Sequence, residues 1–271
     1  MSQAERSRAA PNDCVLEAQG LRKEFRGFVA VAGVNLKIRR GSIHALIGPN
    51  GAGKTTVFNL LTRFLPLSSG RISFESEDVT ALRPDQLAAR GLVRSFQISA
   101  VFANLSVADN IRLALQRPML SAMRFWAGDK AATFGEDRIS GLLGQVGLES
   151  FARERAGDLP YGRKRALEIA TTLAADPKVM LLDEPTQGLG HEDVDRVTDL
   201  IRRAAQGRTV VMVEHNMKMV AQIADTITVL RRGEIIAEGA YQELAENPEV
   251  VEAYLGSNRR GDRSQPGARA S

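Results

Sequence analysis

Short apolar runs alternate along this chain with longer stretches in which apolar residues recur at helical spacing. The short runs are rich in β-branched residues, which is typical of buried strands. The expected strands are Val34–Ile38, Ile43–Ile47, Arg71–Phe74, Val179–Leu182, Thr209–Val213 and Thr226–Leu230. The expected helices are Lys54–Phe64, Pro84–Arg90, Val107–Leu115, Leu167–Ala175, Glu192–Ala205 and Met217–Ala224. Strands and helices that alternate in this way predict an α/β fold.

One part of the chain departs from this alternation. Residues from about 98 to 175 have mainly helical periodicity and few β-branched runs, so we expect a helical subdomain inserted into the sheet domain. The polar ends, residues 1–12 and 257–271, are expected to be flexible tails. Between them, residues 13–256 are expected to form one domain.

The overall composition is that of an ordinary globular protein, with 44% hydrophobic and 25% charged residues. The formal net charge of +4 arises in the two tails, because the region between them is balanced. A basic face for nucleic acid is therefore not predicted. No stretch approaches the roughly 18 apolar residues of a spanning helix, and the N-terminus has no apolar signal core, so we expect a cytosolic chain.

A glycine-rich segment follows the expected strand Ile43–Ile47 and opens the next helix. It fits the pattern G-x-x-x-x-G-K-[S/T] with the residues Gly48, Pro49, Asn50, Gly51, Ala52, Gly53, Lys54 and Thr55. In this pattern backbone N–H groups surround phosphates, the lysine reaches the β- and γ-phosphates, and the threonine hydroxyl binds Mg²⁺. A structural turn is the simpler alternative, but strand, glycines, lysine and threonine together favour a phosphate-binding loop (P-loop).

Two carboxylates end the expected strand Val179–Leu182. Open α/β sheets bind ligands at the carboxyl edge of their strands, where Asp183 and Glu184 would lie. Asp183 is suited to hold the water shell of Mg²⁺, and Glu184 is suited to polarise a water that attacks the γ-phosphate. Two solvated acids are the alternative, but the complete apolar run before them favours a nucleotide hydrolase.

Further motifs follow in a set order. They are Phe25, Gln97 in Arg94–Gln97, Leu159–Arg163 before a helix, Gln187–Gly190 after the carboxylates, and His215 after an apolar strand. Together with the P-loop, this order over about residues 14–256 resembles the ATP-binding cassette (ABC) family. The resemblance implies a P-loop NTPase fold of the ABC type with an inserted helical subdomain.

The resemblance also implies a role for each motif. Phe25 would stack on adenine, Gln97 would link Mg²⁺ and the attacking water to the helical subdomain, and His215 would contact the γ-phosphate. Catalysis is then assigned to Lys54, Gln97, Glu184 and His215, and Mg²⁺ to Thr55, Gln97 and Asp183. ATP contacts would extend from the P-loop through Thr56, while Gly162 of the signature motif would meet ATP held by a partner subunit.

Several segments resemble the ATPase subunits of branched-chain amino acid importers, namely Tyr161–Gly162, Leu167–Ala170, Glu214–Met217 and Pro248–Gly256. Such importers combine a dimer of two ATPases with permease subunits and an external solute-binding protein. The resemblance implies ATP and Mg²⁺ as cofactors and a peripheral place on the cytoplasmic face of the inner membrane. The dimer partner is a second related ATPase or a second copy.

Other functions stay open at this point. Import of urea, an amide or an organic acid is an alternative, because an ATPase does not touch the cargo. A soluble ATP-driven switch usually carries two cassettes or a long coiled-coil insertion, which this sequence lacks. A P-loop kinase is less favoured because of the signature-like segment and His215.

The signature segment departs from the family pattern, which usually has serine at position 160 and glutamine at 163. Pro160 has neither hydroxyl nor N–H for a γ-phosphate. Each ATP would be bound in a composite site, formed by the P-loop of one subunit and the signature segment of the other. We expect slow hydrolysis at the composite site to which Pro160 belongs. Arg163 or Lys164 would be an alternative source of positive charge toward the phosphate. Gly190 replaces an acid common in the wider family.

Some residues carry less specific predictions. The segment Met119–Trp126 is interpreted as subdomain core, with a permease contact as the alternative. Cys14 is expected to be a small core residue of the first strand. His44 and His191 match no family role and are interpreted as structural or solvated.

Overall fold

The computed structural model describes residues 13–95, 101–121 and 128–253. Five predicted features lie wholly or partly outside the described residues, namely the two tails, Gln97 and the segments Met119–Trp126 and Pro248–Gly256. None of the helices in the described ranges has the length and apolar character needed to cross a bilayer.

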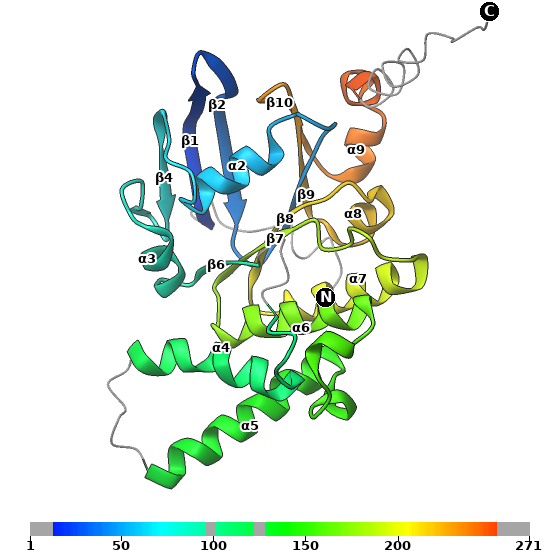
Figure 1. Ribbon diagram of the computed structural model, residues 1–271. Coiled ribbons are helices and arrows are strands. Elements are labelled where there is room, and N and C mark those ends of the chain that lie inside the picture. The colour runs from blue at the N-terminus through cyan, green and yellow to red at the C-terminus, as the bar shows by residue number, and fades with distance from the viewer. Residues whose placement is uncertain (1–12, 96–100, 122–127, 254–271) are drawn as a thin grey trace, which may run out of the picture.

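Two β-sheets lie above the helices α4, α5 and α6 as drawn in Figure 1. An antiparallel sheet has the order β2-β1-β4-β5, and its strands are β1 (Cys14–Phe25), β2 (Phe28–Arg39), β4 (Ser69–Phe74) and β5 (Glu77–Asp78). The second sheet has the order β10-β9-β3-β8-β7-β6 and is parallel except for β10. Its strands are β3 (Ile43–Ile47), β6 (Leu92–Arg94), β7 (Val179–Asp183), β8 (Thr209–Val213), β9 (Thr226–Arg231) and β10 (Glu234–Gly239).

Every residue of the central strands β3, β7 and β8 is buried, which is why their sequences are mainly apolar. On one face, Leu181 and Val213 pack with Phe58 of helix α2 and with the antiparallel sheet. On the other face, Met180 and Met212 belong to a core shared with the remaining long helices. This layered arrangement confirms the predicted α/β class.

The helices are α2 (Lys54–Leu61), α3 (Pro84–Ala89), α4 (Val107–Ser121), α5 (Gly128–Val146), α6 (Tyr161–Ala174), α7 (His191–Ala204), α8 (Met217–Ile223) and α9 (Tyr241–Ala245). Single 3₁₀ turns form at Glu149–Phe151 and Ala156–Asp158. Helices α4, α5 and α6 pack against one another, and all three lie in the part of the chain that we expected to be an inserted helical subdomain. This helical group lies below the sheets in Figure 1.

Helix α2 is shorter than predicted, ending at Leu61 and not at Phe64. The hydroxyl of Thr62 donates to the carbonyl of Phe58 at 2.8 Å, and Arg63 has a φ of 60°. A side-chain bond followed by a left-handed residue ends a helix.

Other boundaries also differ from the prediction. Helix α6 begins at Tyr161, six residues before the predicted start at Leu167, because Pro160 is its N-cap and the first turn is polar. Helix α4 continues beyond Leu115, and α5 was not among the predicted helices. Strands β6 and β10 were also not predicted.

Cys14 is half-buried at the start of β1, so its assignment to the core was wrong. Its Sγ donates to the carbonyl oxygen of Leu16 at 3.3 Å. Burial raises the pKa of the Cys14 thiol, with a smaller contribution from the nearby Glu17. Cys14 is the first residue of β1 and pairs with β2 but not with β4, so only one side of it is covered by a neighbouring strand.

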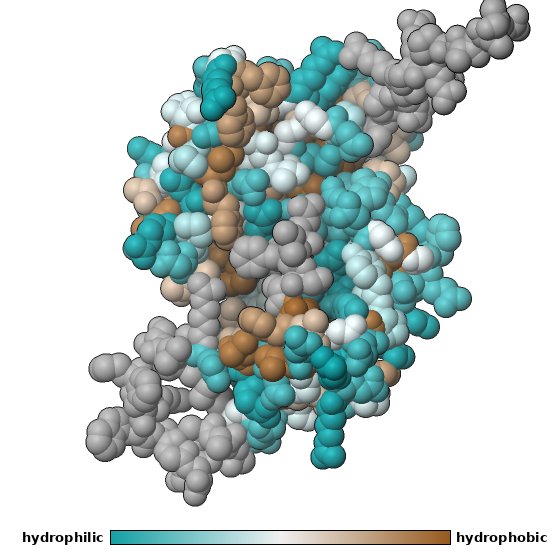
Figure 2. All heavy atoms as spheres, in the orientation of Figure 1, coloured by the Kyte–Doolittle hydropathy of each residue, from teal (hydrophilic) through white to brown (hydrophobic). Residues whose placement is uncertain are grey.

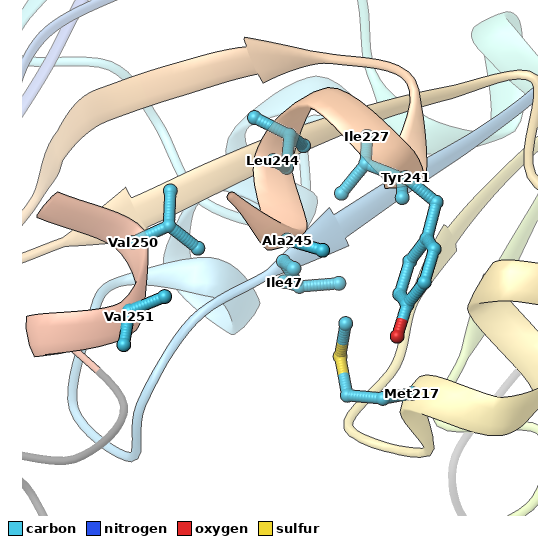
Figure 3. Close-up of a pocket in the computed structure, with 8 residues that line it drawn as sticks. All are labelled: Ile47, Met217, Ile227, Tyr241, Leu244, Ala245, Val250 and Val251. Carbon is cyan, nitrogen blue, oxygen red and sulfur yellow. The ribbon is translucent and has the colours of Figure 1, made fainter. Parts of the chain in front are cut away.

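The C-terminal residues pack beside the end of β3 and enclose an apolar cavity of about 260 Å³ (Figure 3). Its lining comes from three parts of the chain, with the residues Ile47, Met217, Ile227, Tyr241, Leu244, Ala245, Val250 and Val251. In Figure 3 the Tyr241 ring and the Met217 side chain point toward each other across its mouth. The cavity therefore lies between the strand that enters the P-loop and the C-terminal helix.

Apolar side chains also reach the surface of the helical part. Figure 2 shows a brown patch on this part of the molecule, whereas the surface beside it is mostly hydrophilic. The large apolar side chains that are exposed in this part of the chain include Phe102, Leu105, Leu113 and Tyr161. Such a patch on an otherwise polar surface is typical of a contact site for another protein.

Candidate nucleotide-binding site

The P-loop connects the end of β3 to the start of α2. Gly48, Gly51 and Gly53 have φ values of 150°, 77° and 100°. A Cβ at Gly48 would lie 2.2 Å from the carbonyl oxygen of Leu230, and one at Gly53 would lie 2.9 Å from that of Ala30. Glycine is therefore required for close packing at both positions, and the backbone can turn around a ligand.

The turn between β9 and β10 is hydrogen-bonded to the P-loop and packs against it. The N–H of Gly233 donates to the carbonyl of Ala52 at 2.8 Å, and its own carbonyl accepts from the N–H of Ala32 at 2.9 Å. A Cβ at Gly233 would lie 2.6 Å from the carbonyl oxygen of Ala30. Our sequence analysis missed this residue, although glycine after Arg232 between two apolar runs is a turn signal.

Lys54 begins α2 with its side chain folded onto the P-loop. Its ammonium donates to the carbonyl of Gly48 at 2.7 Å and to that of Pro49 at 3.1 Å. Burial lowers the pKa of Lys54, and the negative charge of Glu184 opposes this shift. The loop therefore holds a buried cation near the predicted catalytic carboxylate, while Asn50, Gly51 and Thr55 are exposed and Thr56 is half-buried.

Asp183 ends β7 with its carboxylate buried. Its Oδ2 pairs with Nη2 of Arg94 at 2.6 Å, and Nη1 of the same arginine donates to Oδ1 of Asn59 at 2.5 Å. The other oxygen, Oδ1 of Asp183, is buried and has no hydrogen-bond partner among the described residues. A buried carboxylate oxygen without a donor fits the water shell of a hard cation, so Asp183 suits Mg²⁺, and the predicted ligand Thr55 is exposed in the P-loop.

Glu184 follows Asp183 with an unusual backbone. Its φ is 45°, in the left-handed region that a non-glycine residue rarely adopts. Its N–H donates to the carbonyl of Val213 at 2.9 Å, and its carbonyl accepts from the N–H of Gln187 at 3.0 Å. These bonds hold a conformation that costs about 1–3 kcal/mol, and such strain is concentrated at functional sites.

His215 follows β8 at the same edge of the sheet, and its side chain is 58% exposed. The preceding residue, Glu214, is buried, and its carboxylate accepts from Thr186 and from the backbone of His215 and Asn216. The sequence analysis quoted Glu214 only as part of a family-like segment. A charged residue directly after a buried apolar strand is the signal by which Glu214 could have been found.

The signature segment begins α6. Pro160 is the N-cap, with a φ of −54°, and its carbonyl accepts from the N–H groups of Arg163 and Lys164 at 3.0 Å each. The Arg163 guanidinium lies 3.8 Å from the centroid of the Phe151 ring, and the Lys164 ammonium donates to the carbonyl of Gly157 at 2.6 Å. Both side chains have partners within the helical group, and Arg163 is also exposed to solvent, so their supply of positive charge to a γ-phosphate stays a prediction.

Gly162 faces α7, where a Cβ would lie 2.6 Å from the carboxyl carbon of Asp193. Tyr161 is half-exposed and lies against Gly188 of the loop after β7, whose Cβ would lie 3.5 Å from the ring. Gly190 is the N-cap of α7, and the exposed His191 is its first residue. The signature start and the loop after Glu184 are therefore neighbours within one chain.

Phe25 ends β1 and is 43% exposed, with the Lys23 ammonium 5.1 Å from the ring centroid. An exposed ring beside a cation is suited to receive a base. His44 lies inside the sheet, where Nε2 lies 2.7 Å from the Thr228 hydroxyl, and that hydroxyl donates to Glu238 at 2.5 Å. His44 is thus structural, as predicted.

This combination of a P-loop, two carboxylates at the neighbouring strand end and a helical group defines a P-loop nucleotide-binding protein. The model for ABC transporter ATP-binding domains matches residues 31–187, and a model described as "Branched-chain amino acid ATP-binding cassette transporter" matches residues 234–259. The chain therefore belongs to the ABC transporter ATP-binding family, and it is an ATPase subunit that binds ATP.

Curated relatives match over nearly their full length. The high-affinity branched-chain amino acid transport ATP-binding protein BraF of Pseudomonas aeruginosa is 38% identical over 89% of this chain and 98% of that protein. LivG of Escherichia coli, with the same description, is 37% identical over 89% and 98%. A crystal structure of an ABC transporter cassette in its ADP conformation covers 90% of this chain and 99% of its own, with a TM-score of 0.79 and 30% identity.

Proposed function

We propose that this chain energises uptake of branched-chain amino acids, or of a related small polar solute, through separate permease subunits. The observation that carries the proposal is the match of residues 234–259 to a branched-chain amino acid transporter model, together with the relatives BraF and LivG. The C-terminal strand and helix matched there lie outside the phosphate machinery, so they carry information that a generic ATPase site does not.

Within this proposal the residues of the site have separate tasks. The P-loop and Lys54 bind the phosphates of ATP, with Phe25 on the adenine. Glu184 orients and deprotonates the attacking water, and His215 contacts the γ-phosphate. Thr55, Asp183 and Gln97 would hold Mg²⁺, which supplies charge neutralisation of the β- and γ-phosphates when bound. The products are ADP and inorganic phosphate.

The chain supplies half of each composite site. It has one P-loop and one signature segment, so ATP bound to Lys54 needs a signature glycine equivalent to Gly162 from a second ATPase, either a related one or a second copy. Permease subunits would contact the apolar patch that includes Phe102 and Leu105. Under this proposal the protein is a peripheral subunit at the cytoplasmic face of the inner membrane, and the external solute-binding protein is an indirect partner.

Uptake by cells tests the proposal. We expect replacement of the native gene by a Glu184→Gln variant to abolish energised uptake of radiolabelled leucine while ATP binding persists. Uptake of radiolabelled urea and of an organic acid in the same cells is the comparison. Loss of urea uptake with intact leucine uptake would transfer the assignment to the alternative cargo. Unchanged uptake of every solute, with soluble partners in a mild-detergent purification, would favour an ATP-driven switch.

A further inference from the structure

Glu214 lies between the two loops that carry Glu184 and His215. Its side chain is completely buried, and both oxygens are fully used. Oε1 accepts from the N–H of Thr186 at 2.8 Å and from its hydroxyl at 2.6 Å. Oε2 accepts from the N–H groups of His215 at 2.8 Å and Asn216 at 3.0 Å. A single carboxylate thus joins the loop after β7 to the loop after β8.

This arrangement suits a side chain that only accepts hydrogen bonds. All four partner groups of Glu214 are donors, and a carboxylate is the side chain that only accepts. A glutamine of the same size would place its NH₂ group against at least one N–H donor, that of Thr186, even with the amide turned so that the Thr186 hydroxyl accepts from it. Buried donors left without an acceptor are costly, so the two loops would separate or rearrange. Hydrogen bonds to a charged acceptor are also the stronger kind, which suits a fixed link between loops.

On one side the link reaches the strained catalytic segment. Thr186 follows Glu184 by two residues and is itself buried. The segment is attached to β8 at two successive places, through the bond from the Glu184 N–H to Val213 and through the bonds from Thr186 to Glu214. The left-handed φ of Glu184 persists only if its surroundings hold it, and these two attachments do so.

On the other side the link sets the course of the chain through His215. The N–H groups of His215 and Asn216 both turn toward Glu214, so the His215 ring projects away from the core to solvent. Asn216 then caps α8, its Oδ1 accepting from the N–H of Met219 at 3.2 Å. The His215 backbone is therefore fixed between a buried carboxylate and a helix N-terminus.

We propose that Glu214 is a positioning residue that holds the water-activating Glu184 and the phosphate-contacting His215 at a fixed separation. It touches neither ATP nor water in this role, and its effect on catalysis passes through the two loops. The inference rests on the proposed function only for the roles of Glu184 and His215. A displacement of about 1 Å at such groups is sufficient to cost about 10²-fold in rate.

The test uses the full-length chain in its native assembly and measures ATP turnover and ATP affinity separately. We expect Glu214→Gln to lower kcat by about 10²-fold and to leave the KM for ATP within about twofold of the parent value. Thr186→Val removes one donor and keeps the backbone N–H, so we expect a smaller loss of kcat, about three- to tenfold, again without a change in KM. The effect of Glu214→Gln should shrink severalfold in a His215→Ala background, because the two residues act as a unit.

Thr198→Val is the matched control. Thr198 is as buried as Thr186, but its hydroxyl donates to the carbonyl of Val194 within α7, away from the two loops. We expect this variant to lose some thermal stability and to retain kcat. If Thr186→Val and Glu214→Gln keep the parent kcat, or if Thr198→Val lowers kcat as much as Thr186→Val, the positioning role is overturned. If Glu184→Gln and His215→Ala also keep the parent kcat, the proposed site itself is wrong.

Discussion

Arg94 and Asp183 form a buried ion pair across two neighbouring parallel strands, with Nη2 of the arginine 2.6 Å from Oδ2 of the carboxylate. The arginine side chain is 10% exposed and the aspartate side chain 0%. The pair leaves the second carboxylate oxygen of Asp183 available at the strand edge. Arg94 lies three positions before Gln97 in the sequence, so the ion pair joins the end of β7 to the strand that precedes Gln97.

Removing Arg94 should therefore destabilise the fold. We expect Arg94→Met to lower the free energy of unfolding by about 3 kcal/mol or more, because a buried carboxylate loses its partner. Urea denaturation measures this change. Arg202→Met is the control, since Arg202 and Asp199 form an exposed Arg–Asp pair, and it should change stability little. Equal effects of the two variants would contradict the importance of the buried pair.

Gly48 should be the least replaceable glycine of the P-loop. We expect Gly48→Ala to abolish ATP binding, because its Cβ would lie 2.2 Å from the backbone oxygen of Leu230 and the loop must move. Gly51 is the matched control, since a Cβ there meets nothing within 4 Å and only its φ of 77° is unfavourable. Gly51→Ala should cost about 1 kcal/mol of stability and retain binding of a fluorescent ATP analogue. Retained ATP binding by Gly48→Ala would show that the P-loop can move to accommodate the added methyl group.

Pro160 should limit the composite site that its signature completes. We expect Pro160→Ser to raise ATP turnover of the assembled transporter, because serine restores a hydroxyl and an N–H for the γ-phosphate. A serine N-cap should also stabilise α6 by about 0.5–2 kcal/mol, because the present N-cap has no side-chain bond. Pro84→Ser is the comparison, since Pro84 is the first residue of α3 and not its cap. Unchanged turnover in the reconstituted complex would argue against asymmetry between the two sites.

His44 should make the fold sensitive to acid. Burial, reinforced by the charge of Arg39, lowers the pKa of His44 to about 3 from its ordinary value of 6.5. The unfolded chain therefore binds a proton at a higher pH than the folded chain does. As the pH falls from 6.5 toward 3, this group should remove up to about 1.4 kcal/mol of stability per pH unit.

The His44→Gln variant tests this expectation. Glutamine can still donate to Thr228 but does not titrate, so the variant should lose less stability than the parent between pH 6.5 and 4. His191→Gln is the control, because His191 is exposed at the start of α7. Denaturant unfolding at several pH values gives both slopes. Parallel curves for the parent and His44→Gln would mean that folding does not lower the pKa of His44.

The sequence contains strong signals for the features that depend on neighbouring residues. Strands β3 and β8 agree with prediction residue by residue, because each is mainly apolar and all of its residues are buried. The P-loop and the Asp183–Glu184 pair were found because spacing and context define them. Strand β10 was missed because it is half-exposed at the sheet edge and has no continuous apolar run.

The pattern of hydrophobic and polar residues does not predict contacts between side chains that are far apart in the sequence. Arg94 was quoted only within the segment that ends at Gln97, and nothing local indicates that it pairs with a residue 89 positions away. Glu214 is similar, because its acceptor role depends on Thr186, which is 28 positions earlier. The strand order brings such residues together, and a single sequence does not specify strand order directly.

The turn at Gly233 has a consequence for how the protein is made. The P-loop leaves the ribosome early, with Gly48 to Lys54, but the backbone that holds its outer side is about 180 residues further along the chain. A nascent chain that ends before β10 therefore contains the complete P-loop sequence but lacks the turn at Gly233 that is hydrogen-bonded to it. The hydrogen bond between Gly233 and Ala52 can therefore form only after most of the domain has been synthesised.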